Sequence, residues 1–69
     1  MNYPIIQISS KGYHWHQSGH PWVYKSDTEK CAATEAGLAT LHNARGKFLA
    51  HGIYSPHSKI AFRVLTRRN

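Results

Sequence analysis

The second half of the chain shows the clearest alternation of hydrophobic and polar positions. Between residues 59 and 66, Ile60, Phe62 and Val64 fall on one face, and the intervening residues fall on the other. A period of two residues is typical of a strand with one buried face. We therefore predict a half-buried strand over 59–66.

Two segments before it, 38–42 and 47–54, are also predicted strands. Gly46 lies in the short break between them, where its freedom to take a positive φ helps to close a hairpin. Pro56 lies in the next break, and it has no N–H to give to a strand ladder. The sequence thus predicts three consecutive antiparallel strands.

The first half of the chain predicts shorter elements. Residues 4–8 are rich in isoleucine and favour a strand, with Ile6 and Ile8 facing inward. One of the two serines that follow is expected to cap a helix. That helix, over 11–17, is at most two turns long because its residues have poor helix propensity. With aromatic residues on several sides, one of them must stay partly exposed.

The middle of the chain is harder to interpret. Trp22 lies between a proline and two strand-forming residues, so we expect it to enter a strand as a core residue with its indole N–H bonded. Residues 25–30 are polar and turn-like, whereas 31–37 fit a weak strand, a helical turn or a loop. Cys31 is expected to be a small, half-buried apolar residue.

The charge of the chain points to a polyanionic partner. Nine lysines and arginines face three acidic residues in 69 positions, which gives a net charge of +6 and a pI near 9.9. Such an excess favours nucleic acid first and an acidic membrane surface second. A single cysteine builds no disulfide framework. The lone cysteine therefore indicates a reducing, cytoplasmic setting. The sequence shows neither the pattern of a signal peptide nor an apolar run that could span a bilayer.

Catalytic and metal chemistry have little support in the sequence. The chain has no paired carboxylates and no glycine-rich phosphate loop. His14 and His16 could chelate a metal together with His20, but on a helix the first two would point about 200° apart. No cysteine or carboxylate lies near them to complete a zinc site. We expect no enzyme activity, no cofactor and no metal.

Three blocks of sequence resemble a known family. They are Gly19-His-Pro-Trp-Val-Tyr24, Asn43-Ala-Arg-Gly-Lys-Phe-Leu49, and the run from Tyr54-Ser-Pro to Arg63-Val-Leu-Thr-Arg67. Together they resemble the N-terminal PUA-like domain of the S-adenosylmethionine-dependent methyltransferases that modify cytosine-5 in large-subunit ribosomal RNA. The likeness runs from Lys11 to Arg67, although histidines stand at 14 and 16 where the family is rich in arginine and lysine.

The resemblance implies both a fold and a function. It implies an α+β pseudo-barrel of about five mostly antiparallel strands with one short helix, and residues 1–69 would form one PUA-like RNA-binding domain. In the family, the S-adenosylmethionine site and the catalytic cysteines lie in a large C-terminal domain that has no counterpart here. We therefore expect an RNA-binding module for ribosomal or other structured RNA, either stand-alone or the targeting part of a methyltransferase, and not an enzyme by itself.

The resemblance also implies where RNA would lie, namely along the helix, the loop after it and a nearby strand. The implied contact residues are Lys11, Gly12, Tyr13, His14, His16, Gly19, His20, Arg63, Arg67 and Arg68. Lysine and arginine would neutralise phosphates, and glycines would let the RNA approach the backbone. Either Tyr13 or Trp15 could stack on an unpaired base or plug the end of the barrel.

One competing class of function stays open. Small barrels also bind peptides or pair through an edge strand, so a protein-interaction module is the alternative. A homodimer is a further possibility because so small a core gives little stability. The position of the basic residues, on one face or scattered around an apolar patch, discriminates between these classes.

Overall fold

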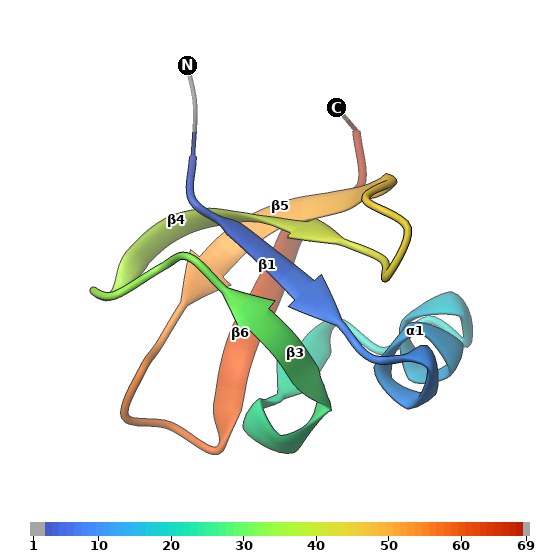
Figure 1. The fold of residues 1–69 in the computed structure, drawn as a ribbon, viewed down its shortest axis with the longest axis horizontal. Coiled ribbons are helices and arrows are strands. Elements are labelled where there is room, and N and C mark those ends of the chain that lie inside the picture. The colour runs from blue at the N-terminus through green and yellow to red at the C-terminus, as the bar shows by residue number, and fades with distance from the viewer. Residues whose placement is uncertain (1–2, 69) are drawn as a thin grey trace.

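Six strands of the computed structural model, which describes residues 3–68, form one mixed sheet beside a single short helix (Figure 1). Along the sheet the strands lie in the order β2-β6-β5-β4-β1-β3. In chain order, the elements are β1 (Ile5–Ile8), α1 (Ser10–Gln17), β2 (Trp22–Tyr24), the 3-10 turn η1 (Lys25–Asp27), β3 (Thr28–Cys31), β4 (Gly37–His42), β5 (Phe48–Tyr54) and β6 (Ile60–Thr66).

The predicted meander is confirmed, with each strand boundary within one residue of its expected place. β4 pairs with β5 and β5 with β6, both antiparallel. β1 joins the other side of β4 in parallel, and β3 pairs antiparallel with β1. β2 pairs antiparallel with β6 and forms the opposite edge of the sheet.

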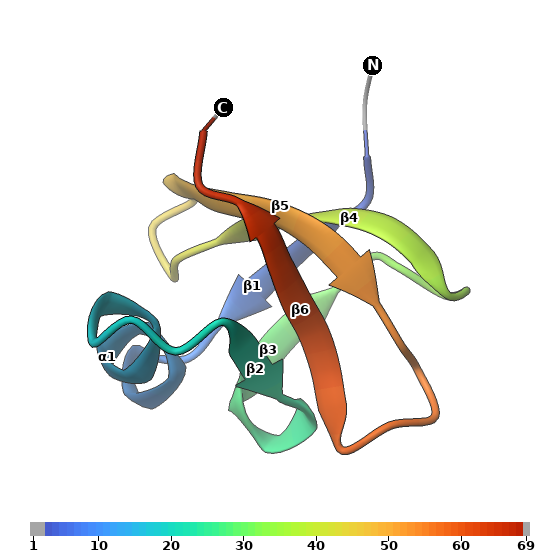
Figure 2. The same ribbon diagram turned by 180° about the vertical axis from the view of Figure 1, so that it is seen from behind.

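The sheet curls because its two edges are tied together in sequence. β2 and β3 lie at opposite ends of the strand order, yet only the three residues of η1 join them. A flat sheet of six strands cannot satisfy so short a connection, because neighbouring strands lie about 4.8 Å apart. The sheet therefore bends into a half-barrel, with β2, η1 and β3 closing one side (Figure 2).

The core fills the inside of this half-barrel. Its largest fully buried side chains are Phe62, Ile6, Ile8 and Leu41, from three different strands. The inward positions predicted for Ile6 and Ile8 are thus confirmed, and Phe62 lies on the predicted inner face of β6. Small residues complete the packing, among them Ala39 and Ala50 on the paired strands β4 and β5.

α1 starts where the sequence predicted and is held against the closing turn. Ser9 is its N-cap, and the Ser9 side chain accepts a hydrogen bond from the Gly12 N–H at 3.1 Å. The Ser9 N–H in turn donates to the Asp27 main-chain oxygen at 2.8 Å. A Cβ on Gly12 would lie 2.9 Å from the Asp27 Cβ. Glycine at position 12 therefore allows the helix to pack closely on η1.

Two expectations for the middle of the chain need correction. The polar stretch 25–30 is a turn only over Lys25–Asp27, because Thr28–Cys31 forms β3, the sixth strand of a fold for which about five were expected. Its side chains are mostly exposed, so it is recruited by backbone pairing with β1 and leaves no hydrophobic signal. Cys31 is exposed and not half-buried; its thiol donates to the Ala33 carbonyl at 3.4 Å.

At Gly52 the strands β5 and β6 pack so closely that adding one methyl group should strongly destabilise the fold. A Cβ on Gly52 would overlap the Arg63 carbonyl oxygen and lie 2.7 Å from the Phe62 ring. Because neither backbone nor a core ring can move aside cheaply, Gly52→Ala should lower the free energy of unfolding by about 3 kcal/mol or more. Urea unfolding would measure this.

Gly46→Ala is the matched control. Gly46 has a φ of 82°, and a Cβ added there would meet nothing within 4 Å. The same substitution should therefore cost only the left-handed backbone strain, about 1–2 kcal/mol. Equal losses in the two variants would contradict the packing account.

Candidate nucleic-acid interface

Positive charge lies entirely on the surface of the domain. All nine lysine and arginine residues are exposed. Arg63 lies in the middle of β6, with Lys59 just before that strand and Arg67 just after it. A second, smaller group is formed by Arg45 and Lys47, at the turn between β4 and β5. The β2–β6 edge therefore carries a run of cations along its length.

Four aromatic rings form a continuous row beside this edge. The ring centroids of His14 and Trp15 are 5.9 Å apart, those of Trp15 and His20 are 5.3 Å apart, and those of His20 and Trp22 are 6.1 Å apart, all edge-to-face. The row runs from α1 across the following loop to β2. We call these four residues the aromatic row. Trp15 is 45% exposed, and His14 is exposed as well.

Arginines flank the aromatic row. The Arg67 guanidinium donates hydrogen bonds to the main-chain oxygens of His16 (3.4 Å) and His20 (3.2 Å), which ties the end of β6 to the end of α1. A cation at a helix C-terminus is also favoured by the helix dipole. Arg63 lies directly opposite Trp22 across the β2–β6 pair, so both side chains leave the same face.

The helix adds one more cation to the same side. Lys11 is exposed and lies four residues before Trp15, and residues four apart share a helix face. Gly19, in the loop after the helix, has a φ of 98° and open space around it. Arg68 is exposed and follows Arg67 at the end of the strand. Lys11 and Gly19 thus lie next to members of the aromatic row, to which the predicted residues His14 and His20 themselves belong.

Other residues on the predicted list do not reach this surface. Gly12 is buried against Asp27 and allows the helix to pack closely there. His16 is only 6% exposed. Tyr13 is half-buried against the core, and its hydroxyl accepts a hydrogen bond from the Gln17 amide at 2.6 Å. Of the two stacking candidates, Trp15 is thus the surface ring and Tyr13 the packed one.

Trp22 differs from its prediction. It lies in β2 as expected, but it is half-buried, and within residues 3–68 its indole nitrogen has no hydrogen-bond partner. The reason is the alternation along the strand. Val23 faces the core and is 3% exposed, so its neighbour Trp22 points outward.

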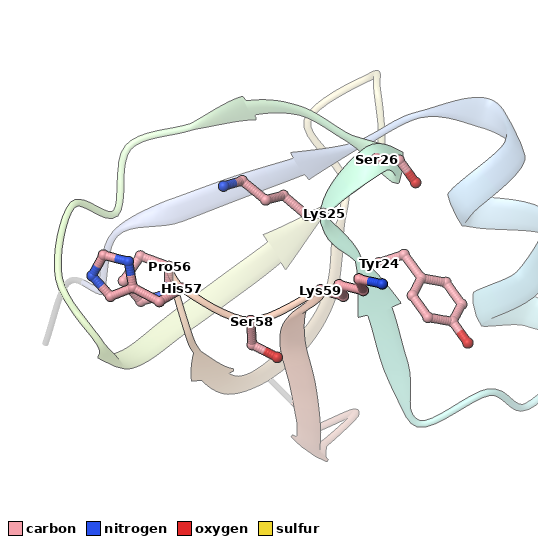
Figure 3. Close-up of a pocket in the computed structure, with 7 residues that line it drawn as sticks. All are labelled: Tyr24, Lys25, Ser26, Pro56, His57, Ser58 and Lys59. Atoms are coloured by element: carbon pink, nitrogen blue, oxygen red, sulfur yellow. The ribbon is translucent and has the colours of Figure 1, made fainter.

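A broad cleft continues the basic edge beyond β2. It has a volume of about 760 Å³ and lies between η1 and the turn that joins β5 to β6 (Figure 3). The Lys59 side chain extends toward Tyr24, whereas Lys25 extends the opposite way. The Lys25 N–H donates to the Lys59 main-chain oxygen at 2.8 Å, which holds the two lysines together. Sequence reasoning missed both because the pairing of β2 with β6 leaves no local signal.

Metal ligands do not gather in the part of the chain that the structure describes, where no three histidine, cysteine or acidic residues lie close enough to hold an ion. α1 has eight residues and is too short and polar to cross a membrane, and residues 3–68 contain no longer α-helix.

Comparison with known proteins gives a consistent result. The sequence model of the PUA-like domain family matches residues 6–67. The chain is 45% identical over 51 residues to a ribosomal RNA large subunit methyltransferase of Deinococcus radiodurans. The aligned region covers 71% of this chain and 12% of that protein. It is 41% identical over 49 residues to ribosomal RNA large subunit methyltransferase I of Serratia proteamaculans, covering 68% of this chain and 12% of the relative.

These matches confirm the resemblance that the sequence motifs indicated. The half-barrel with one short helix is likewise the PUA-like fold that was expected. The chain spans only about 12% of the length of the curated relatives.

Burial of His16 predicts a pH-dependent stability. Desolvation, and secondly the charge of Arg67, lower the pKa of His16 below its usual 6.5. The unfolded chain therefore takes up a proton at this site more readily than the folded one. The contribution of neutral His16 is complete above about pH 6.5 and is lost as the pH falls below it, so the free energy of unfolding should decline there.

Urea unfolding at several pH values between about 7.5 and 5 tests this slope. His16→Gln should flatten the slope, whereas His14→Gln, at an exposed position on the same helix, should leave it unchanged. An unaltered slope in His16→Gln would assign the pH dependence to other groups.

Proposed function

The chain belongs to the PUA-like domain family, and from this premise we propose that residues 1–69 act as one RNA-binding domain that uses the aromatic row as its contact surface. The observation that carries the proposal is the position of three exposed cations around a row of rings in which Trp15 is open to solvent. Lys11, Arg63 and Arg67 flank Trp15 and its neighbours. Nucleic acid is the partner whose two parts, phosphate and base, match these two kinds of side chain.

The cations and the aromatic rings would contribute to RNA binding in different ways. Lysine and arginine that neutralise phosphates release counterions, which supplies most of the sequence-independent affinity. An exposed ring such as Trp15 offers a stacking surface to an unpaired base, worth roughly 1–3 kcal/mol by alanine substitution. Because stacking needs splayed bases, the favoured target is a structured RNA with a single-stranded loop or bulge.

The relatives suggest ribosomal RNA as that target. Both are named as large-subunit ribosomal RNA methyltransferases, and the region they share with this chain is the PUA-like domain. In our proposal the domain binds RNA in the cytoplasm and performs no catalysis itself. It would act as a stand-alone adaptor or as the targeting part of a methyltransferase.

A protein-interaction module is the second candidate. Leu38 on β4 and Leu65 on β6 are large, exposed apolar side chains, and β2 and β3 are the two edges of the sheet. Such features serve peptide binding or homodimer formation. Three basic residues, Lys11, Arg63 and Arg67, nevertheless flank the aromatic row, which favours RNA.

A salt titration tests the RNA proposal. With a structured ribosomal RNA hairpin, affinity should fall steeply with salt, and Lys11→Ala and Arg63→Ala should each reduce the log–log slope by about 0.7–0.9. Trp15→Ala should weaken binding about 5- to 150-fold with little change in slope.

Lys30→Ala is the matched control, because Lys30 is exposed on β3 at the other edge of the sheet. Its slope should equal that of the unmodified protein. If the slopes of all four variants equal that of the unmodified protein, the proposed surface is wrong. No binding at low salt would favour the protein-interaction module.

A further inference from the structure

A small cleft opens between α1, β2 and η1, next to the aromatic row. Its volume is about 260 Å³, just below the range of about 300–1,000 Å³ for pockets that hold drug-sized ligands. Trp15 and Tyr24, which are 45% and 48% exposed, contribute to its lining. The full lining is Gly12, Trp15, His20, Trp22, Val23, Tyr24 and Asp27. Aromatic walls and this size suit one flat heterocycle.

Asp27 gives the cleft an unusual polar group. The residue is 6% exposed, yet among residues 3–68 its carboxylate has neither a hydrogen bond nor an ion pair. Its hydrogen bond with Ser9 uses the main-chain oxygen instead. Within residues 3–68, the side-chain atoms that are both shielded from solvent and without a hydrogen-bond partner are His16 Nδ1 and Trp22 Nε1, and the unpaired Asp27 oxygens are not among them. The carboxylate is therefore reachable from the cleft that it lines.

The Asp27 side chain is largely buried, yet no donor within residues 3–68 pairs with its carboxylate, so its oxygens stay free to accept hydrogen bonds from a group in the cleft. The packing on Gly12 uses the Asp27 Cβ and main-chain oxygen and leaves the carboxylate free. A ligand that donates hydrogen bonds would use these acceptors. The cleft is therefore built for a flat ring that carries donors at its edge.

The geometry points to an unpaired guanine, and we propose that this cleft binds one guanine base of the RNA that the domain contacts. An ionised carboxylate is an acceptor only, with two oxygens that can take a bidentate partner. Guanine places two adjacent donors, N1–H and N2–H, on one edge. Adenine, cytosine and uracil each place an acceptor beside their donor, which the carboxylate would repel.

The surroundings of the cleft fit an RNA strand that inserts one base. Trp15, His20 and Trp22 belong both to the cleft and to the aromatic row. Tyr24 lines this cleft and also the broad basic cleft that contains Lys59. The phosphates on either side of an inserted guanine would thus have cations nearby. This inference rests on the proposed RNA-binding function and adds a base preference to it.

Short oligouridine strands with one central guanosine, adenosine or cytidine, and an all-uridine strand, test the preference in direct binding titrations. The guanosine strand should bind about tenfold more tightly than the others. Inosine, which lacks the N2 amino group, should lose most of this advantage. The inosine comparison uses the unmodified protein and so does not depend on any variant folding.

Asp27→Asn completes the test, because the amide keeps the shape of the side chain but replaces one acceptor with a donor. An NMR spectrum would first show that the variant is folded. Its affinities for the four strands should then differ by no more than about twofold, which is less than the affinity difference that one bidentate pair of hydrogen bonds provides. Equal binding of the four strands by the unmodified protein would overturn the guanine site while leaving RNA binding intact. A preference for the guanosine strand that persists in Asp27→Asn would also overturn the guanine site. Failure of every strand and of the ribosomal hairpin would instead overturn the proposed function itself.

Discussion

Closure of the half-barrel through η1 is the constraint on which the site depends. Three residues connect strands at opposite ends of the sheet order, and the Asp27 main-chain oxygen of that connection accepts the Ser9 N–H at the start of α1. Gly12 then lets the helix pack directly on Asp27. The same contact that closes the barrel therefore fixes the helix, and the helix sets the position of Trp15 beside β2.

The far end of the helix is fixed by charge. Arg67 bonds the main-chain oxygens of His16 and His20, so the loop between α1 and β2 is held by a side chain from the end of β6. His16 is buried under this connection with a lowered pKa. The exposed rings and cations thus stand on a framework held at both ends. A surface prepared in this way loses less conformational entropy when it binds a partner.

Local patterns predicted some of this structure and missed the rest for physical reasons. The alternation around Phe62 and the pair of serines before the helix, of which Ser9 is the cap, are signals within a few residues, and both predictions were confirmed. β3 was missed because an exposed edge strand is held by backbone pairing. The burial of His16 and the free carboxylate of Asp27 were missed because both arise from helix packing on a distant turn. For the proposed site, the family resemblance implied cations on the helix and the last strand, whereas no local pattern indicated which rings face outward.

The central claim, that RNA lies on the aromatic row, is tested most directly by NMR with the ribosomal RNA hairpin. The chain has two tryptophans, and both belong to the row, so their indole N–H signals report on it alone. The account predicts that the Trp15 indole signal shifts most during the titration, together with amides of α1 and β6. Unmoved indole signals, with shifts confined to β3 or to the turn around Arg45, would contradict it.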